Sequence, residues 1–376
     1  MSRRFTLLLS IAATHIVAAA PTWTWKTFTD ERDIWLRSSC DGVLMFDYRL
    51  GAGGAIAEMR DVPSGNKRLL SPSFQGEATD RIIQWTWWSD SITNAVAGLP
   101  SFEHRFNVTQ GGDFVGQPAP IIAVMIRPKE NIVDVFSVPQ DQWKTQQQSF
   151  MKNKISALTR YEMAADGVLK VRRVMLVDRV KLTGKTTPFA KLYIEGWSPF
   201  DRSGTFDGLA LALDGKGTPN WWYRAGENIP NYPVLAAAKT SGYAVVYQTS
   251  NPQANPAVGL VFGTGEVIPA NKSNALVLNT MSWDNGIAIL PALGLADVAE
   301  GSVIDVTIAL LPRRSLDAEM SARLRALVPQ IPAPIVHPPG TAFTGEIAKI
   351  VTQLRANQSS TGKRTEHLAT QISTTP

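Results

Sequence analysis

Residue types suited to chemistry gather between Phe102 and Pro120, in a segment that separates two regions of alternating apolar and polar residues. Its polar side chains include His104, Arg105, Asn107, Gln110 and Asp113. An imidazole can exchange a proton near neutral pH, and a guanidinium can neutralise an anion. Glycines at positions 111, 112 and 116 let the backbone turn sharply. We therefore predict a polar binding loop, with a well-bonded connection between two strands as the alternative.

The segment from Asp80 to Asp90 is the most aromatic strand that the sequence predicts. Strand alternation places Arg81 and Trp85 on one face, and Gln84 and Trp88 on the other. One face must meet the core, and the sequence leaves open which. A sugar ring packs its C–H face on an aromatic ring while its hydroxyls take directional hydrogen bonds. We predict that these four residues contact a carbohydrate; core packing of the tryptophans is the alternative.

A second aromatic group lies between Trp197 and Tyr232, where a short apolar stretch precedes a Gly- and Pro-rich run. We predict that this run is a loop, because its composition is unsuited to a regular strand or helix. The residues predicted to contact substrate here are Trp221, Trp222 and Asn228, and those predicted to transfer protons are Tyr223 and Tyr232. Tyrosine loses its proton against a pKa near about 10, so a neighbouring arginine would have to lower that value. Alternatively, the aromatic residues close a sheet edge.

Predicted strands follow one another at nearly regular spacing, with almost no amphipathic helix before residue 315. This pattern predicts an all-β protein built as a large antiparallel β-sandwich. One short C-terminal helix is expected over Ser315 to Val328, with Ser315 as its N-cap. The expected divisions are a signal peptide over 1–20, a β-sandwich domain over 21–312, a helix and Pro-rich segment over 313–340, and a helix fragment with a mobile tail over 341–376.

The first 20 residues resemble a cleavable secretory signal. Arg3 and Arg4 precede an apolar run, and three alanines at positions 18–20 supply small residues for cleavage. We therefore expect a secreted protein, extracellular or, in a bacterium, periplasmic. Cys40 is the single cysteine, so an intramolecular disulfide is excluded.

Composition narrows the class of partner. With 44% hydrophobic and 18% charged residues, the chain is expected to fold as a globular protein. Its net charge of +5 comes from basic residues spread along the chain, which argues against a nucleic-acid partner. We predict no later membrane span, and expect a poly- or oligosaccharide as the partner.

No cofactor is predicted; calcium is an alternative, with Asp113 among its ligands. Sequons at Asn107, Asn271 and Asn357 predict a glycoprotein if the source is eukaryotic, and a glycan on Asn107 would turn it away from a tight site.

Three segments carry a family resemblance. GGAIAEMRD (Gly53 to Asp61), DRIIQW (Asp80 to Trp85) and RFNVTQGGDFVGQPAP (Arg105 to Pro120) together resemble the galactose-mutarotase-like superfamily of aldose epimerases and polysaccharide lyases. The resemblance implies a large antiparallel β-supersandwich whose concave face carries a sugar site. It implies carbohydrate chemistry without selecting a reaction.

The choice of reaction follows from the side chains available. Epimerases of this type resemble two-histidine, one-carboxylate enzymes, whereas His104 is the single histidine between residues 16 and 336. β-Elimination of a uronic-acid polymer needs a group that neutralises the carboxylate, a base and an acid. Arg81 or Arg105 could neutralise, His104 or Tyr223 could be the base, and Tyr232 or Tyr223 the acid. A polysaccharide lyase is therefore the leading prediction. The alternatives are a glycoside hydrolase using a pair from Glu58, Asp113, Glu195 and Asp207, an epimerase, or a non-catalytic glycan-binding protein.

Overall fold

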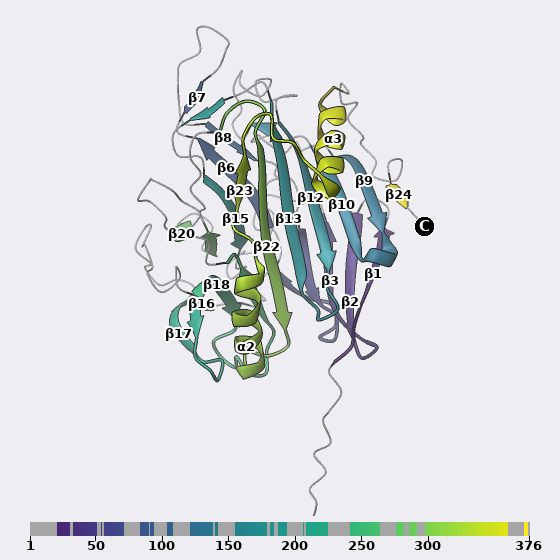
Figure 1. Cartoon of the computed structure of the whole chain (residues 1–376). Coiled ribbons are helices and arrows are strands. Elements are labelled where there is room, and N and C mark those ends of the chain that lie inside the picture. Colours follow the sequence, from purple (N-terminus) through teal and green to yellow (C-terminus); the bar gives the residue numbers. More distant parts are fainter. Residues whose placement is uncertain are drawn as a thin grey trace, which may run out of the picture.

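The computed structural model of the chain describes residues 21–30, 33–50, 54, 56–70, 83–89, 91–93, 104–107, 121–137, 140–141, 155–178, 181–183, 187–193, 206, 208–224, 241–263, 276–281, 286–291, 298–359 and 372–374. These ranges form two large sheets packed face to face, with helices on the outside of one of them (Figure 1). A small additional sheet pairs β7 (Ser91–Thr93) with β14 (Lys181–Thr183). The all-β antiparallel sandwich with a short C-terminal helix, predicted from the sequence, is confirmed.

The first sheet has 11 strands. In spatial order its main path is β1 (Trp23–Asp30), β2 (Asp33–Cys40), β3 (Val43–Leu50), β4 (Ile56–Asp61), β6 (Ile83–Ser89), β15 (Thr187–Tyr193), β21 (Gly286–Pro291) and β20 (Leu276–Met281). Beside this path, β5 (Lys67–Leu70) pairs with β4, β8 (His104–Asn107) pairs with β6, and β11 (Gln140–Asp141) pairs with β8.

The second sheet also has 11 strands. Its path is β17 (Pro219–Arg224), β16 (Gly208–Leu213), β18 (Tyr243–Tyr247), β19 (Ala257–Val261), β22 (Val303–Arg313), β13 (Leu169–Val177), β12 (Ile155–Met163), β10 (Ile132–Ser137), β9 (Ile121–Arg127) and β24 (Ile372–Thr374). The short β23 (Ile335–His337) pairs with β22, and the 3-10 turn η2 (Pro128–Glu130) joins β9 to β10. Within the described ranges the strand pairs are antiparallel, apart from β24, which runs parallel to β9.

The core between the sheets is formed by every second side chain of the strands. In the first sheet Leu36 lies opposite Tyr48, and both are fully buried. In the second sheet Tyr161, Val171 and Ile308 form one row across three strands, each at most 1% exposed. Full burial of such side chains stabilises the fold by about 1.5–3 kcal/mol each relative to exposure. Burial of these apolar side chains therefore selects the face that each sheet turns toward the other.

The two sheets approach closely at Gly54, just before β4. Its φ of +76° belongs to the left-handed region, and a Cβ there would lie 2.6 Å from Cγ1 of Val135 on the second sheet. The Tyr161 hydroxyl donates a hydrogen bond to the Gly54 carbonyl oxygen. Glycine at this position thus permits a contact between the sheets that a larger residue would prevent.

Helix α2 (Ala318–Leu327) covers the outer face of the second sheet near β18 and β19 (Figure 1). Met320, Leu324 and Leu327 supply its buried stripe. The N-cap predicted at Ser315 is wrong by two residues. Asp317 is the N-cap, because its carboxylate accepts a hydrogen bond from the Met320 backbone N–H at 2.9 Å. The 3-10 turn η4 (Val328–Gln330) ends the helix.

Helix α3 (Gly345–Ser359) lies on the same outer face, over β12 and β13 (Figure 1). Ile350, Val351 and Leu354 pack against apolar residues of the sheet, including Leu158 and Val174. Both described helices of eight or more residues therefore cover the second sheet.

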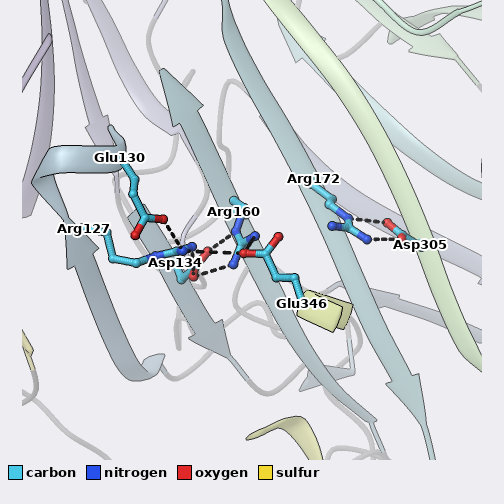
Figure 2. Close-up of polar contacts among 7 residues, drawn as sticks. All are labelled: Arg127, Glu130, Asp134, Arg160, Arg172, Asp305 and Glu346. Atoms are coloured by element: carbon cyan, nitrogen blue, oxygen red, sulfur yellow. Dashed lines mark hydrogen bonds and ion pairs between the residues drawn. The ribbon is translucent and has the colours of Figure 1, made fainter. Parts of the chain in front are cut away.

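A network of charged residues also holds α3 to the sheet (Figure 2). Asp134, only 1% exposed, accepts hydrogen bonds from Arg160 at 2.6 and 2.8 Å and from Arg127 at 2.9 Å. Glu346, in the first turn of α3, forms an ion pair with Arg160, with its Oε1 2.6 Å from Nη1, the terminal nitrogen that Asp134 does not bind. The helix is thus joined to a buried ion pair as well as to an apolar patch.

The attachment of α3 should depend on pH. Partial burial acts to raise the pKa of the Glu346 carboxyl, but the hydrogen bond and charge of Arg160, with Arg127 and Arg172, outweigh it and hold the pKa below its ordinary value of 4.5. The stabilisation is therefore complete above pH 4.5 and is lost as the pH falls through the lowered pKa. In denaturant titrations above pH 4.5, Glu346→Gln should have a lower free energy of unfolding than the wild type, and this difference should shrink as the pH falls. Parallel pH profiles for the two proteins would contradict this role.

Two sequence predictions about local structure need correction or stay open. The Gly- and Pro-rich run that contains Trp221 and Trp222 was predicted as a loop, yet it includes the strand β17. The domain divisions stay predictions. The expected tail includes β24, which the structure adds to the edge of the second sheet.

Candidate functional site

Two segments that the sequence separately predicts to contact a ligand are neighbours in the first sheet. Strand β6 carries the tryptophan-rich segment and β8 begins the polar segment. They pair antiparallel, with Trp88 opposite Arg105 and Thr86 opposite Asn107. Residues directly opposite one another in an antiparallel pair belong to the same face. The register therefore brings a tryptophan, an arginine and an asparagine position together.

The neighbouring strand decides which face of β6 points inward. Ile56 of β4 is fully buried in the core between the sheets, and it pairs with Ile83. Ile83 thus takes an inward position, and alternation assigns inward positions to Trp85 and Trp87. Gln84 and Trp88 take outward positions. Of the two faces that the sequence left open, the register selects the one with Gln84 and Trp88 for the outer surface.

The same register separates two predicted site residues of β8. Arg105 and Asn107 lie at outward positions, whereas His104 is opposite Ser89 at an inward position. Trp85 shares that inward side. The structure therefore brings Arg105 together with Trp88, but it does not bring His104 to the same face.

The aromatic residues of the second predicted region belong to the other sheet. Trp221, Trp222 and Tyr223 lie on β17, the edge strand at one end of the second sheet. Tyr223 is opposite Leu209, which is opposite the buried core residue Val246, so its register position is inward. The remaining predicted residues, which lie outside the described ranges, are Arg81, Gln110, Asp113, Asn228 and Tyr232.

Described side chains on the outer face of β3 and β4 form a buried ion-pair cluster. Glu58 is 2% exposed, and its two carboxylate oxygens accept hydrogen bonds from Nε of Arg49 at 3.1 Å and Nε of Arg60 at 2.5 Å. Beside it, Asp47 binds Arg37 through two hydrogen bonds of 2.6 and 2.5 Å. Glu58 was considered as a hydrolytic carboxylate, but here it holds two arginines in place.

An aromatic layer adjoins this cluster on the outer face. Trp35 stacks on Phe28 with ring centroids 6.2 Å apart, and the guanidinium carbon of Arg60 lies 4.8 Å from the Trp35 ring centroid. Trp35 is 7% exposed, and its indole N–H has no hydrogen-bond partner in the part of the chain that the structure describes. Trp35 and Arg60 were not among the site residues predicted from the sequence. The alternation of residues 33–40 was the signal that could have placed Trp35 on the outer face.

The outer face of the first sheet, from β2 to β15, carries more basic than acidic residues at outward register positions. The basic residues are Arg37, Arg49, Arg60, Arg68, Arg105 and Lys191. The acidic residues are Asp33, Asp47 and Glu58. A basic surface with aromatic rings is suited to an anionic ligand with apolar faces.

A cavity of about 380 Å³ lies on the outer face of the second sheet. Its charged lining includes Arg160, Lys170, Arg172, Glu162 and Asp305. Figure 2 shows the Arg172–Asp305 pair beside the Arg160 network, and the two hydrogen bonds of that pair measure 2.9 and 2.5 Å. Because each of these charged side chains already has a partner of opposite charge, the cavity offers less to an anion than the first sheet does.

Neither a metal-ligand group nor a membrane-spanning helix occurs among the described residues. There, no group of three or more His, Cys, Asp or Glu residues is arranged to hold a metal ion. Calcium binding stays a prediction. None of the helices described combines the length and apolarity needed to cross a membrane.

Comparison with known proteins gives similarity at the level of solved structures. No family model and no curated protein matches the chain. A galactose 1-epimerase from Lactobacillus acidophilus matches with 9% identity and a TM-score of 0.34, over 78% of this chain and 99% of the other. A provisional aldose 1-epimerase from Klebsiella pneumoniae matches with 9% identity and a TM-score of 0.40, over 84% and 89%. A 4-α-glucanotransferase from Thermococcus litoralis matches with 12% identity and a TM-score of 0.30, over 77% and 39%. At these TM-scores the likeness supplies no functional argument.

Proposed function

We propose that the chain is an exported carbohydrate-active enzyme that binds a uronic-acid-containing polysaccharide on the outer face of the first sheet and cleaves it by β-elimination. The observation that carries the proposal is the β6–β8 register, which assigns Gln84, Trp88, Arg105 and Asn107 to one face. That face continues into the basic and aromatic layer around Trp35.

The chemistry assigns a role to each type of residue. Trp88, at its outward register position, would offer a ring face to the C–H side of a sugar. Arg105, assisted by Asn107, would neutralise the C6 carboxylate and so acidify the C5 proton. A base then removes that proton, the C5–H electron pair forms the C4–C5 double bond, and the glycosidic oxygen leaves from C4 with a proton from an acid. The base and acid predicted from the sequence are not on this face, because His104 and Tyr223 take inward positions and Tyr232 lies outside the described ranges.

A non-catalytic glycan-binding protein is the second candidate. It is favoured by one observation, namely that His104 and Arg105 take opposite faces of β8. Binding needs the aromatic and basic face alone, whereas elimination needs a base on the same side as the neutralising arginine.

A glycan panel tests the proposal. The protein is incubated with polyuronates and with neutral polysaccharides, with and without EDTA, and each reaction is read by ultraviolet absorbance of unsaturated uronate and by reducing ends. We expect both signals to rise together on a polyuronate only. Reducing ends without absorbance would replace elimination by hydrolysis, and binding without either signal would leave the glycan-binding protein. If the protein neither bound nor cleaved any polyuronate, the proposal would be overturned. Loss of activity in EDTA would identify a metal requirement.

A further inference from the structure

Arg173 places a guanidinium inside the sandwich. It lies on β13 and is 0% exposed. Its neighbours at alternate positions on that strand, Val171 and Met175, belong to the core between the two sheets. Arg173 therefore points into the apolar interior, in contrast to the preceding Arg172, which lines the outer cavity and pairs with Asp305.

The polar atoms around Arg173 lack partners. None of its three side-chain nitrogens has a hydrogen-bond partner in the described ranges. Thr159 lies directly opposite Arg173 on β12, and its buried hydroxyl likewise has none. The Tyr161 hydroxyl donates its hydrogen bond to the Gly54 carbonyl oxygen, so it is not available to Arg173 as a donor-free acceptor. Four unsatisfied polar atoms thus occur at two adjacent positions of the same inward face.

This arrangement is costly unless another group is present. Burial lowers the pKa of Arg173 to about 9, which still leaves the guanidinium charged near neutral pH. An isolated charge in an apolar interior is strongly unfavourable, and buried charges in proteins are paired or otherwise coordinated. A counter-ion would both neutralise Arg173 and accept its hydrogen bonds.

The chemistry of the unsatisfied atoms defines that counter-ion. The guanidinium offers donors only, and the threonine hydroxyl can donate as well, so the group between them must be an acceptor with negative charge. Full enclosure of Arg173 favours a small ion over an organic acid. We propose that Arg173 and Thr159 bind a chloride ion between the two sheets. This site is separate from the outer face proposed to bind glycan, and it acts on stability whether or not that function holds.

A chloride titration of the full chain tests the proposal. The thermal unfolding midpoint is measured while chloride replaces gluconate at constant ionic strength. Because an ion that binds the folded state alone stabilises it by mass action, the wild-type midpoint should rise by a few degrees and then saturate. Arg173→Met should abolish the dependence, and its midpoint in gluconate should equal or exceed that of the wild type. Thr159→Val should shift the titration to higher chloride.

Arg172→Met is the matched control, since it removes the neighbouring outward arginine and should keep the chloride dependence. Bromide-soaked crystals of the wild type should show an anomalous peak within hydrogen-bond distance of Arg173, a readout that survives if a variant fails to fold. A wild-type midpoint independent of chloride, with no bromide peak, would overturn the proposal. So would an Arg173→Met variant destabilised equally in chloride and gluconate, because a loss that does not depend on the anion would show that Arg173 does not act through bound chloride.

Discussion

Arg105→Ala is expected to lower kcat/KM by about 100-fold on the polyuronate that the chain is proposed to cleave, the usual effect of removing one group that stabilises developing negative charge. Arg105 lies at an outward position beside Trp88, where a guanidinium can reach a carboxylate on the glycan. Removing it raises the barrier to C5 deprotonation while leaving the sandwich interior intact. Initial rates over a range of substrate concentrations, together with the unfolding midpoint, measure both consequences.

Two variants make this prediction specific to Arg105. Arg105→Lys should retain part of the activity, because it keeps the charge but not the forked geometry. Arg355→Ala removes the same charge from an exposed position on α3, on the other sheet, and should leave kcat/KM unchanged. Equal rates for Arg105→Ala and Arg355→Ala would remove Arg105 from the site.

Asp134→Ala is expected to reduce the free energy of unfolding by about 3–5 kcal/mol, the range for breaking a buried ion pair from one side. Asp134 is 1% exposed and binds Arg160, whose side chain is only 6% exposed, as well as Arg127 (Figure 2). Without the carboxylate, these arginines lose the hydrogen bonds that compensate their burial. Denaturant unfolding at neutral pH measures the difference.

Glu130→Ala provides the matched control for Asp134→Ala. Glu130 binds the same Arg127 at 2.6 Å, but its side chain is 56% exposed. Exposed ion pairs contribute about 0–1 kcal/mol because water and salt screen them. Similar losses for the two variants would show that burial does not set the strength of this network.

The alternation of β6 could be predicted from sequence, whereas the face it turns inward could not. A period of two assigns Gln84 and Trp88 to one face, but the choice of face depends on the pairing of Ile56 with Ile83, which are distant along the chain. The polar segment raises a related difficulty. His104 and Arg105 could approach one ligand from a loop, but adjacent residues of a strand point to opposite faces.

Other differences have local physical causes. The Gly- and Pro-rich composition around β17 favoured a loop, yet Pro219 stands at the first position of the strand, where proline is tolerated. Two consecutive arginines within β13 oblige one of them to point inward, although the sequence does not reveal whether the interior supplies a partner. The outer-face layer around Trp35 depends on contacts between strands, so composition alone could not assemble it.

The most direct test of the central claim compares one polyuronate with its carboxyl-reduced form in equilibrium binding to the wild type. The two polymers share linkages and hydroxyls, and differ in the charge that the basic outer face of the first sheet is proposed to recognise. We predict at least about tenfold weaker binding of the reduced polymer, matching the loss of one charge-assisted contact of about 1.5–3 kcal/mol, and weaker binding of the acidic polymer in high salt. Equal affinities for the two polymers, independent of salt, would contradict the proposed recognition of an acidic glycan.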